Sequence, residues 1–130
     1  MTTTYERVES PSRQRGALRQ IISGAAVFDG AMGIFCLAAA SQIASWLSVS
    51  PASVRVTGVV FLVASAEGVI TLARSVHDVR WIVAANVLFA ACCVGVLAFD
   101  DPNAIGAVLL AGGAICSGAT AALEHRLTRR

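Results

Sequence analysis

Charged side chains are scarce in this 130-residue chain: 14% of the residues are charged, lysine is absent, and all ten basic residues are arginine. Soluble domains carry about 25% charged residues, and disordered segments and nucleic-acid-binding arms are rich in charge. The composition therefore excludes these three classes and predicts no nucleic-acid partner. Apolar residues dominate instead, at 56% of the chain with a mean hydropathy of +0.72, which is typical of an integral membrane protein.

Side chains that carry out catalysis or bind cofactors are also few. The four cysteines include no C-x-x-C pair, and the adjacent Cys92 and Cys93 point to different faces of a helix. His77 and His125 fall at the expected ends of helices, whereas a haem held between helices needs histidines within the spans. We therefore expect no catalytic residue, no metal and no cofactor, and we interpret the cysteines as small apolar residues that fill gaps.

Four apolar segments have the length of about 20 residues that a helix needs to cross the hydrocarbon layer. They are residues 21–47, 56–73, 81–99 and 104–123. Because the bilayer interior offers no water to backbone amides, spans of this length must be helical. The connections between them are short, so the sequence predicts an all-α, membrane-embedded four-helix bundle with antiparallel, up-down-up-down helices.

The arginines predict the orientation of this bundle. Nine of the ten fall before the first span, between the second and third spans, or after the fourth, and Arg55 alone lies on the other side. By the positive-inside rule both termini are cytoplasmic, in a membrane that we expect to be a bacterial inner membrane. Residues 1–19 are predicted to be a mobile cytoplasmic tail, 20–126 the four-span domain, and 127–130 a cytoplasmic C-terminal tail.

A layer of polar residues is predicted inside the membrane, consisting of Asp29, Glu67, Asn86, Thr120 and Glu124. The first three lie six to ten residues from an arginine at the cytoplasmic rim, so the helix rise places them about 9 to 15 Å from it. Thr120 and Glu124 close the layer from the inner end of the fourth span. The spacing from Asp29 to Glu67 equals that from Asn86 to Glu124, which leaves an internal repeat open.

The two acids at membrane depth have two interpretations. In the first, Asp29 and Glu67 are neutral, or paired with Arg74 or Arg80, and fix the association of the helices through hydrogen bonds. In the second, they form a proton-binding pair, because intramembrane carboxyl groups are characteristic of proton relays. The sequence leaves both interpretations open.

Small residues at helical spacing predict where helices approach closely. They are Ala26, Gly30 and Gly33 in the first span, Ala64 and Gly68 in the second, and Gly113, Ser117 and Gly118 in the fourth. Phe28 lies on a different strip and is expected to meet lipid. Small-residue faces also suit contacts between chains, so the predicted partners are membrane lipid and either a second copy of the chain or another membrane protein.

The pattern of spans resembles that of small four-helix bacterial integral membrane proteins of unknown function. The arginine-rich N-terminal segment, the Ala85-Asn86 pair and the sequence LEHR at 123–126 carry this resemblance, which implies a membrane fold and no activity. The acid in the first span is also similar to that of small multidrug resistance transporters, which act as dimers and exchange protons for cationic drugs. This chain departs from them in having aspartate at position 29, few aromatic residues and a second acid, Glu67.

From these features we expect a non-enzymatic small integral membrane protein that self-associates or serves as an accessory membrane component. The alternative is a proton-coupled transporter of a small molecule or ion, in which Asp29 and Glu67 carry the protons. An enzyme is the least favoured class, because the sequence has no nucleophile with an adjacent base, no metal-ligand spacing and no glycine-rich phosphate loop.

Overall fold

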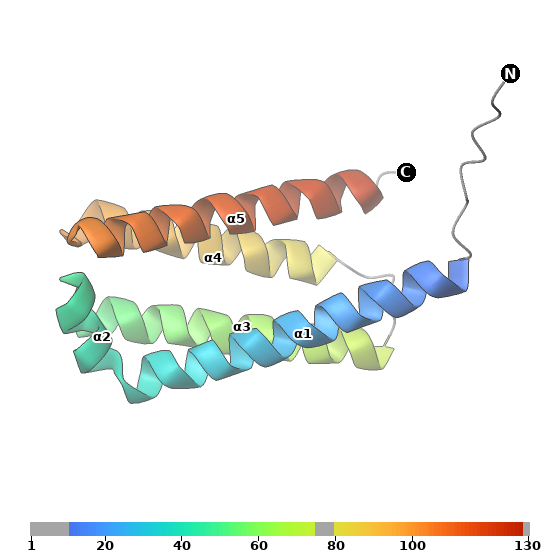
Figure 1. The fold of residues 1–130 in the computed structure, drawn as a ribbon, viewed down its shortest axis with the longest axis horizontal. Coiled ribbons are helices and arrows are strands. Elements are labelled where there is room, and N and C mark those ends of the chain that lie inside the picture. The colour runs from blue at the N-terminus through green and yellow to red at the C-terminus, as the bar shows by residue number, and fades with distance from the viewer. Residues whose placement is uncertain (1–10, 75–79, 129–130) are drawn as a thin grey trace, which may run out of the picture.

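The computed structural model describes residues 11–74 and 80–128, which form five α-helices (Figure 1). They are α1 (Pro11–Ala38), α2 (Ala40–Leu47), α3 (Pro51–Arg74), α4 (Arg80–Phe99) and α5 (Ala104–Thr128). Four of them contain segments long and apolar enough to cross a membrane: Arg19–Ala38, Pro51–Arg74, Arg80–Phe99 and Ala104–Ala122. The described residues contain no strand, and the prediction of an all-α four-helix membrane bundle is confirmed.

The first predicted span, 21–47, consists of two helices rather than one. At Ala39 the backbone leaves the helical conformation, with φ −109° and ψ 23°. No proline or glycine stands at this position, so the break has no local signal in the sequence. Packing accounts for it instead, because the bend places Ala40 and Ala44 of α2 in a buried cluster with Val54 of α3.

The helix α1 also begins earlier than predicted. Residues 1–19 were predicted to be a tail, whereas the chain is helical from Pro11 onward. Proline is well tolerated as the first residue of a helix, where its missing amide has no partner to lose and its fixed φ suits the helix. At the other end, α5 continues through Thr128, beyond the predicted limit of the fourth span. Residues 1–10 lie outside the described part of the chain.

The short helix α2 closes one end of the bundle, opposite the end where α1 begins and α5 finishes (Figure 1). It contacts α1, α3 and α5. Asn103, which precedes α5, binds its C-terminal end: the Asn103 amide donates to the Leu47 carbonyl at 3.0 Å, and Nδ2 donates to the Trp46 carbonyl at 2.7 Å. These bonds satisfy carbonyl groups that the end of a helix leaves without partners.

The four long helices are arranged as two antiparallel pairs (Figure 1). α1 packs along α3, α4 packs along α5, and contacts between α3 and α4 join the two pairs. Within the described residues α1 contacts neither α4 nor α5. The bundle is therefore closed between α3 and α4 and parted between α1 and α5.

Small residues form the seam between α1 and α3. A Cβ atom added at Gly33 would lie 2.7 Å from Leu62 Cγ and 2.9 Å from the Gly58 carbonyl oxygen, so the backbones are in close contact there. Likewise, a Cβ at Gly68 would lie 2.9 Å from that of Ala26. Gly30 faces Ser65, whose hydroxyl donates a 2.7 Å hydrogen bond to the Ala26 carbonyl. Gly58 belongs to the same seam, although the sequence analysis did not single it out.

The predicted packing positions on α5 have different surroundings. Gly113 packs against α4, where an added Cβ would lie 3.3 Å from the Phe89 ring and 3.5 Å from Cys93 Sγ. Gly118 was predicted to pack against a neighbouring helix, but within the described chain a Cβ there would meet nothing within 4 Å. The two positions are five residues apart and therefore lie on different sides of the helix.

Candidate ligand cavity between the helix pairs

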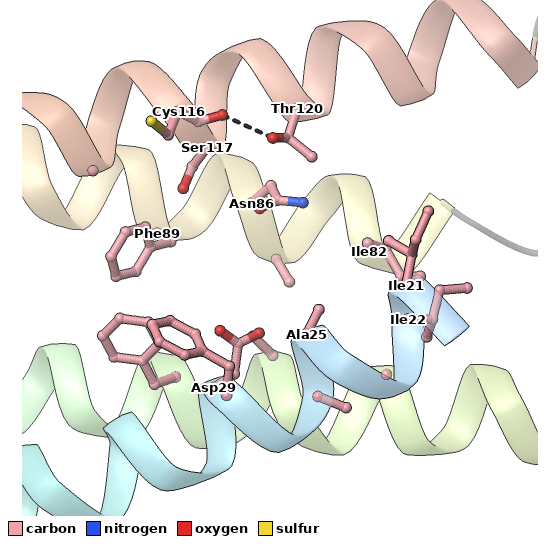
Figure 2. Close-up of a pocket in the computed structure, with 17 residues that line it drawn as sticks. Ile21, Ile22, Ala25, Asp29, Ile82, Asn86, Phe89, Cys116, Ser117 and Thr120 are labelled. Atoms are coloured by element: carbon pink, nitrogen blue, oxygen red, sulfur yellow. Dashed lines mark hydrogen bonds between the residues drawn. The ribbon is translucent and has the colours of Figure 1, made fainter. Parts of the chain in front are cut away.

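A cavity of about 450 Å³ lies between the two helix pairs, and we refer to it as the central cavity (Figure 2). All four long helices contribute to its walls. The lining residues are Ile21, Ile22, Ala25, Ala26, Phe28 and Asp29 of α1, Phe61, Ala64 and Gly68 of α3, Ile82, Ala85, Asn86 and Phe89 of α4, and Gly113, Cys116, Ser117 and Thr120 of α5. Most of these side chains are apolar, and Asp29 is the one acid among them.

Exposure differs between the walls of the central cavity. The lining residues of α3 and α4 are buried or half-buried and form its floor. Those on the other two helices include exposed side chains at the rim: Ile21 and Phe28 of α1 are 68% and 60% exposed, and Cys116 and Thr120 of α5 are exposed as well. Since no Cα atom of α1 lies within 8 Å of one of α5 in the described chain, the cavity opens sideways between these two helices.

Asp29 supplies the one carboxylate among the described lining residues of the central cavity. Its side chain is half-buried, and Figure 2 shows it directed from α1 into the gap that separates α1 from α4 and α5. Among the described residues, no arginine, lysine or histidine lines the cavity, and Asp29 forms no ion pair. Thr120, on the opposite wall, donates its hydroxyl hydrogen to the Cys116 carbonyl of its own helix at 2.9 Å.

Three of the five residues of the predicted polar layer line the central cavity: Asp29, Asn86 and Thr120. Glu67 does not. Ser65, two residues before it, bonds to α1, and two residues correspond to about 200° around a helix, so Glu67 lies on the far side of α3 from that contact. The structure therefore does not bring the two acids together around the cavity. The side chain of Glu124 lies outside the described residues, as does His77.

The aromatic walls were missed by the sequence analysis. Phe61 of α3 and Phe89 of α4 face each other across the pairs, with ring centroids 4.6 Å apart and planes inclined by 48°. Phe28 was expected to meet lipid, and it is indeed exposed, yet it also lines the rim of the cavity. Helical spacing could have found Phe89, because it lies three residues after Asn86 and so on the same face.

Five of the eight predicted packing residues line the central cavity: Ala26, Ala64, Gly68, Gly113 and Ser117. Their small side chains leave room that larger side chains would fill. Space of this kind at the meeting point of several helices is a common location for ligand sites in bundles.

The cysteines occupy separate environments. Cys92 Sγ lies 3.6 Å from the Thr57 hydroxyl of α3, whereas Cys93 lies beside Gly113 of α5, which confirms that the adjacent pair points to different faces. Cys36 and Cys93 are buried, and Cys116 is exposed at the rim of the cavity. In the described ranges, no group of three histidine, cysteine or acidic side chains is placed to hold a metal ion.

A second polar cluster lies at the α2 end of the bundle, where α3 begins and α4 ends. The Asp100 carboxylate accepts hydrogen bonds from the Ser53 side chain and the Ser50 amide, and these hydrogen bonds hold its pKa below the usual value. Ser50 caps α3, because its Oγ accepts the Ser53 amide at 3.0 Å. This cluster is remote from the central cavity and joins the end of α4 to the start of α3.

Fold and cavity together define the class: a small multi-pass integral membrane protein with a mostly apolar cavity between its helices. Comparison with protein-family models, curated proteins and solved structures finds no match to this chain.

Proposed function

We propose that this protein binds a small apolar cation in the central cavity and transports it in exchange for a proton on Asp29. The observation that carries the proposal is the isolation of that carboxylate: Asp29 lines a membrane-embedded cavity that has no basic side chain among its described lining residues. A charge at the bilayer centre costs about 2.5 to 3.5 kcal/mol on insertion scales. A proton or a bound cation removes that charge, and one carboxylate has room for one of them at a time.

The size and the walls of the cavity support a cationic ligand. Its volume of about 450 Å³ falls within the range of about 300 to 1,000 Å³ that is typical of small-molecule sites. Phe28, Phe61 and Phe89 contribute aromatic rings, whose faces attract cations. Asn86, Ser117 and Thr120 add polar groups on the α4 and α5 walls.

The proposal is compatible with the expected membrane and orientation of the protein. The arginine distribution supports cytoplasmic termini and a bacterial inner membrane. The exchange of a cation for a proton makes and breaks no covalent bond in the ligand, so the protein acts as a carrier without enzymatic activity or cofactor.

Proton release on ligand binding tests the proposal. The purified protein in lipid nanodiscs, in weakly buffered solution with a pH-sensitive dye, is mixed with dodecyltrimethylammonium, whose single positive charge cannot be lost. We expect the wild type to release protons in amounts that scale with protein concentration, and Asp29→Asn to release none. Glu67→Gln is the matched control, because it removes the other acid of the spans, which does not line the cavity, and it should behave as the wild type.

Two results would overturn the proposal: no proton release from the wild type, or the same release from Asp29→Asn. Far-ultraviolet circular dichroism and gel filtration of each variant establish that the helical fold is retained. A transport assay completes the test, in which an imposed pH gradient across proteoliposomes drives uptake of the cation by the wild type and by Glu67→Gln only.

Self-association is the second candidate function, and one surface favours it. On the outward face of α5, Gly112 and Gly118 have nothing within 4 Å of an added Cβ, and Ile115 and Ala119 are exposed. Small residues allow two helices to approach closely in a membrane. The test introduces Ala119→Cys in a Cys116→Ser background, in which a disulfide between two copies should form in vesicles. Addition of Gly112→Leu should abolish that disulfide. Absence of the disulfide both with and without Gly112→Leu would exclude this contact.

A further inference from the structure

We infer that the ligand reaches Asp29 from the hydrocarbon layer, through a lateral opening between α1 and α5, and is therefore a membrane-dissolved amphiphile with one cationic group. This inference rests on the proposed function, because it takes the central cavity as the binding site. It adds the route of entry, and with it a restriction on the substrate: a hydrated cation without an apolar part has no path to the site.

The lateral opening follows from the contacts between helices. α3 and α4 touch and form the floor of the cavity, whereas α1 contacts neither α4 nor α5 within the described ranges. The rim consists of lining residues that are exposed sideways, among them Phe28 of α1 and Cys116 of α5. Both rim segments lie within helices that have the length and composition of membrane spans, so this side of the molecule meets acyl chains.

The α2 end of the bundle offers no entrance. α2 lies across that end (Figure 1), and Asn103 ties its last carbonyl groups to the start of α5. Gly106 is buried against α2, since a Cβ there would lie 2.7 Å from the Leu47 carbonyl oxygen. Ala40 and Ala44 of α2 are buried as well. A ligand on this side would have to displace a packed helix.

The opposite end of the cavity is apolar. Figure 2 shows Ile21 and Ile22 of α1 and Ile82 of α4 gathered at the end nearer the start of α4. A hydrated cation that passed these side chains would lose its water without compensation. A cation that is already dissolved in the bilayer through an apolar tail meets no such barrier on the lateral route, because only its head moves from the membrane to Asp29.

Spin labelling at Cys116 tests the opening directly. Cys36, Cys92 and Cys93 are replaced by alanine, a nitroxide is attached at Cys116 in lipid vesicles, and its collisions with O₂ and with a water-soluble nickel chelate are measured. O₂ concentrates in the hydrocarbon layer and the chelate stays in water. Two matched controls come from the same chain: Ile115→Cys, an exposed position in the α5 span, and Ser45→Cys, an exposed position on α2.

A lateral opening predicts that the label at Cys116 collides with O₂ as the label at position 115 does, and scarcely with the chelate. Chelate access at Cys116 equal to that at position 45 would overturn the inference, because the cavity would then open to water. Labelling of the otherwise unchanged chain, in which Cys116 is the one exposed cysteine of the described residues, repeats the measurement if the triple replacement fails to fold.

Addition of ligand probes separates the route from the binding site. Dodecyltrimethylammonium should reduce O₂ collisions at Cys116 and leave those at position 115 unchanged, whereas tetramethylammonium, which has the same head and no tail, should change neither. Equal effects of the two cations would overturn the assignment to membrane-dissolved amphiphiles. A third outcome is that O₂ reaches the label at Cys116 but neither cation changes the collisions, in the wild type and in Asp29→Asn alike. This outcome would overturn the proposed function while confirming the opening.

Discussion

The Asp100 carboxylate accepts a 2.9 Å hydrogen bond from the Ser50 amide and so links the end of α4 to the residue that caps α3. Ser50 in turn accepts the Ser53 amide at 3.0 Å, and Pro51 occupies the first position of the helix. The negative charge of Asp100 lies near the N-terminus of α3, where the helix dipole favours an anion. One acidic side chain thus completes the cap of a neighbouring helix and joins the two pairs.

The hydrogen bond between Asp100 and Ser50 predicts that the stability of the fold depends on pH. Because the hydrogen bonds lower the pKa of Asp100 in the folded state, the folded chain binds protons less readily than the unfolded chain, and the contribution is present above the unfolded pKa. It is lost as the pH falls below about 3.8. Thermal unfolding in detergent should show Asp100→Ala less stable than the wild type at pH 7, with the difference shrinking toward pH 3. The neighbouring, exposed Asp101→Ala should match the wild type throughout, and a constant difference for Asp100→Ala would contradict the prediction.

Asn103 is predicted to contribute to stability through both ends of its side chain. Its Oδ1 accepts the Gly106 amide at 2.9 Å as the cap of α5, and its Nδ2 donates to the Trp46 carbonyl. Loss of a helix cap costs about 1 kcal/mol, and the bond to α2 is lost as well, so Asn103→Ala should lower the free energy of unfolding by about 1 to 2 kcal/mol. Asn103→Asp retains the cap acceptor, so its free energy of unfolding should lie between those of the wild type and Asn103→Ala. Equal stabilities of Asn103→Ala and wild type in a denaturant titration would contradict this role.

The glycines of the seams are predicted to differ sharply in their tolerance of alanine. At Gly33 a Cβ would lie 2.9 Å from the backbone carbonyl of Gly58, which cannot move without shifting α3, so Gly33→Ala should lower the free energy of unfolding by about 1 to 3 kcal/mol. Gly118→Ala is the control, because the added methyl group meets nothing within 4 Å. Alanine's higher helix propensity should make that variant as stable as the wild type or more stable, by up to about 1 kcal/mol. Equal losses in both variants would show that α1 and α3 are not in close contact at Gly33.

Phe89 is predicted to contribute to ligand affinity without contributing to proton exchange. Phe89→Leu keeps an apolar side chain against Gly113 but removes the aromatic face beside Phe61. A cation–π contact of about 0.5 to 2 kcal/mol corresponds to a loss in affinity of about 2- to 30-fold. Calorimetric titration with dodecyltrimethylammonium should detect this loss, while saturating ligand still releases protons. Phe35→Leu, on α1 and away from the cavity, should leave the affinity unchanged, and a comparable loss in that variant would contradict the assignment.

The helical class and the spans could be predicted because they depend on local composition. About 20 apolar residues in a row cross a bilayer only as a helix, whatever their neighbours are, and the start of α4 at Arg80 and of α5 at Ala104 agrees with the sequence to within one residue. The small residues of the α1–α3 seam were predicted for the same kind of reason, since close helix approach requires them. The break at Ala39 was not, because its cause is the packing of α2 against distant residues.

The candidate site was predicted in part. Depth along a helix follows from residue number, so Asp29, Asn86 and Thr120 were grouped in one predicted layer, and the structure places all three at one cavity. Direction around the helix depends on where the neighbouring helices lie, and this is why Glu67 was grouped with Asp29 although it does not line that cavity. The Asp100 and Asn103 contacts were missed because each joins residues about 50 positions apart in the chain.

The sequence by itself determined that this is a four-span membrane protein with an acid at depth in its first span, because hydropathy and the helix rise act over a few turns of one segment. The tertiary structure decided that α1 pairs with α3 and α4 with α5, that α1 and α5 stay apart, and that Asp29 faces the space between them. In a bilayer every helix surface is similarly apolar, so the pairing depends on the fit of small residues and on a few hydrogen bonds between helices. These are properties of two surfaces in contact, and no single segment contains them.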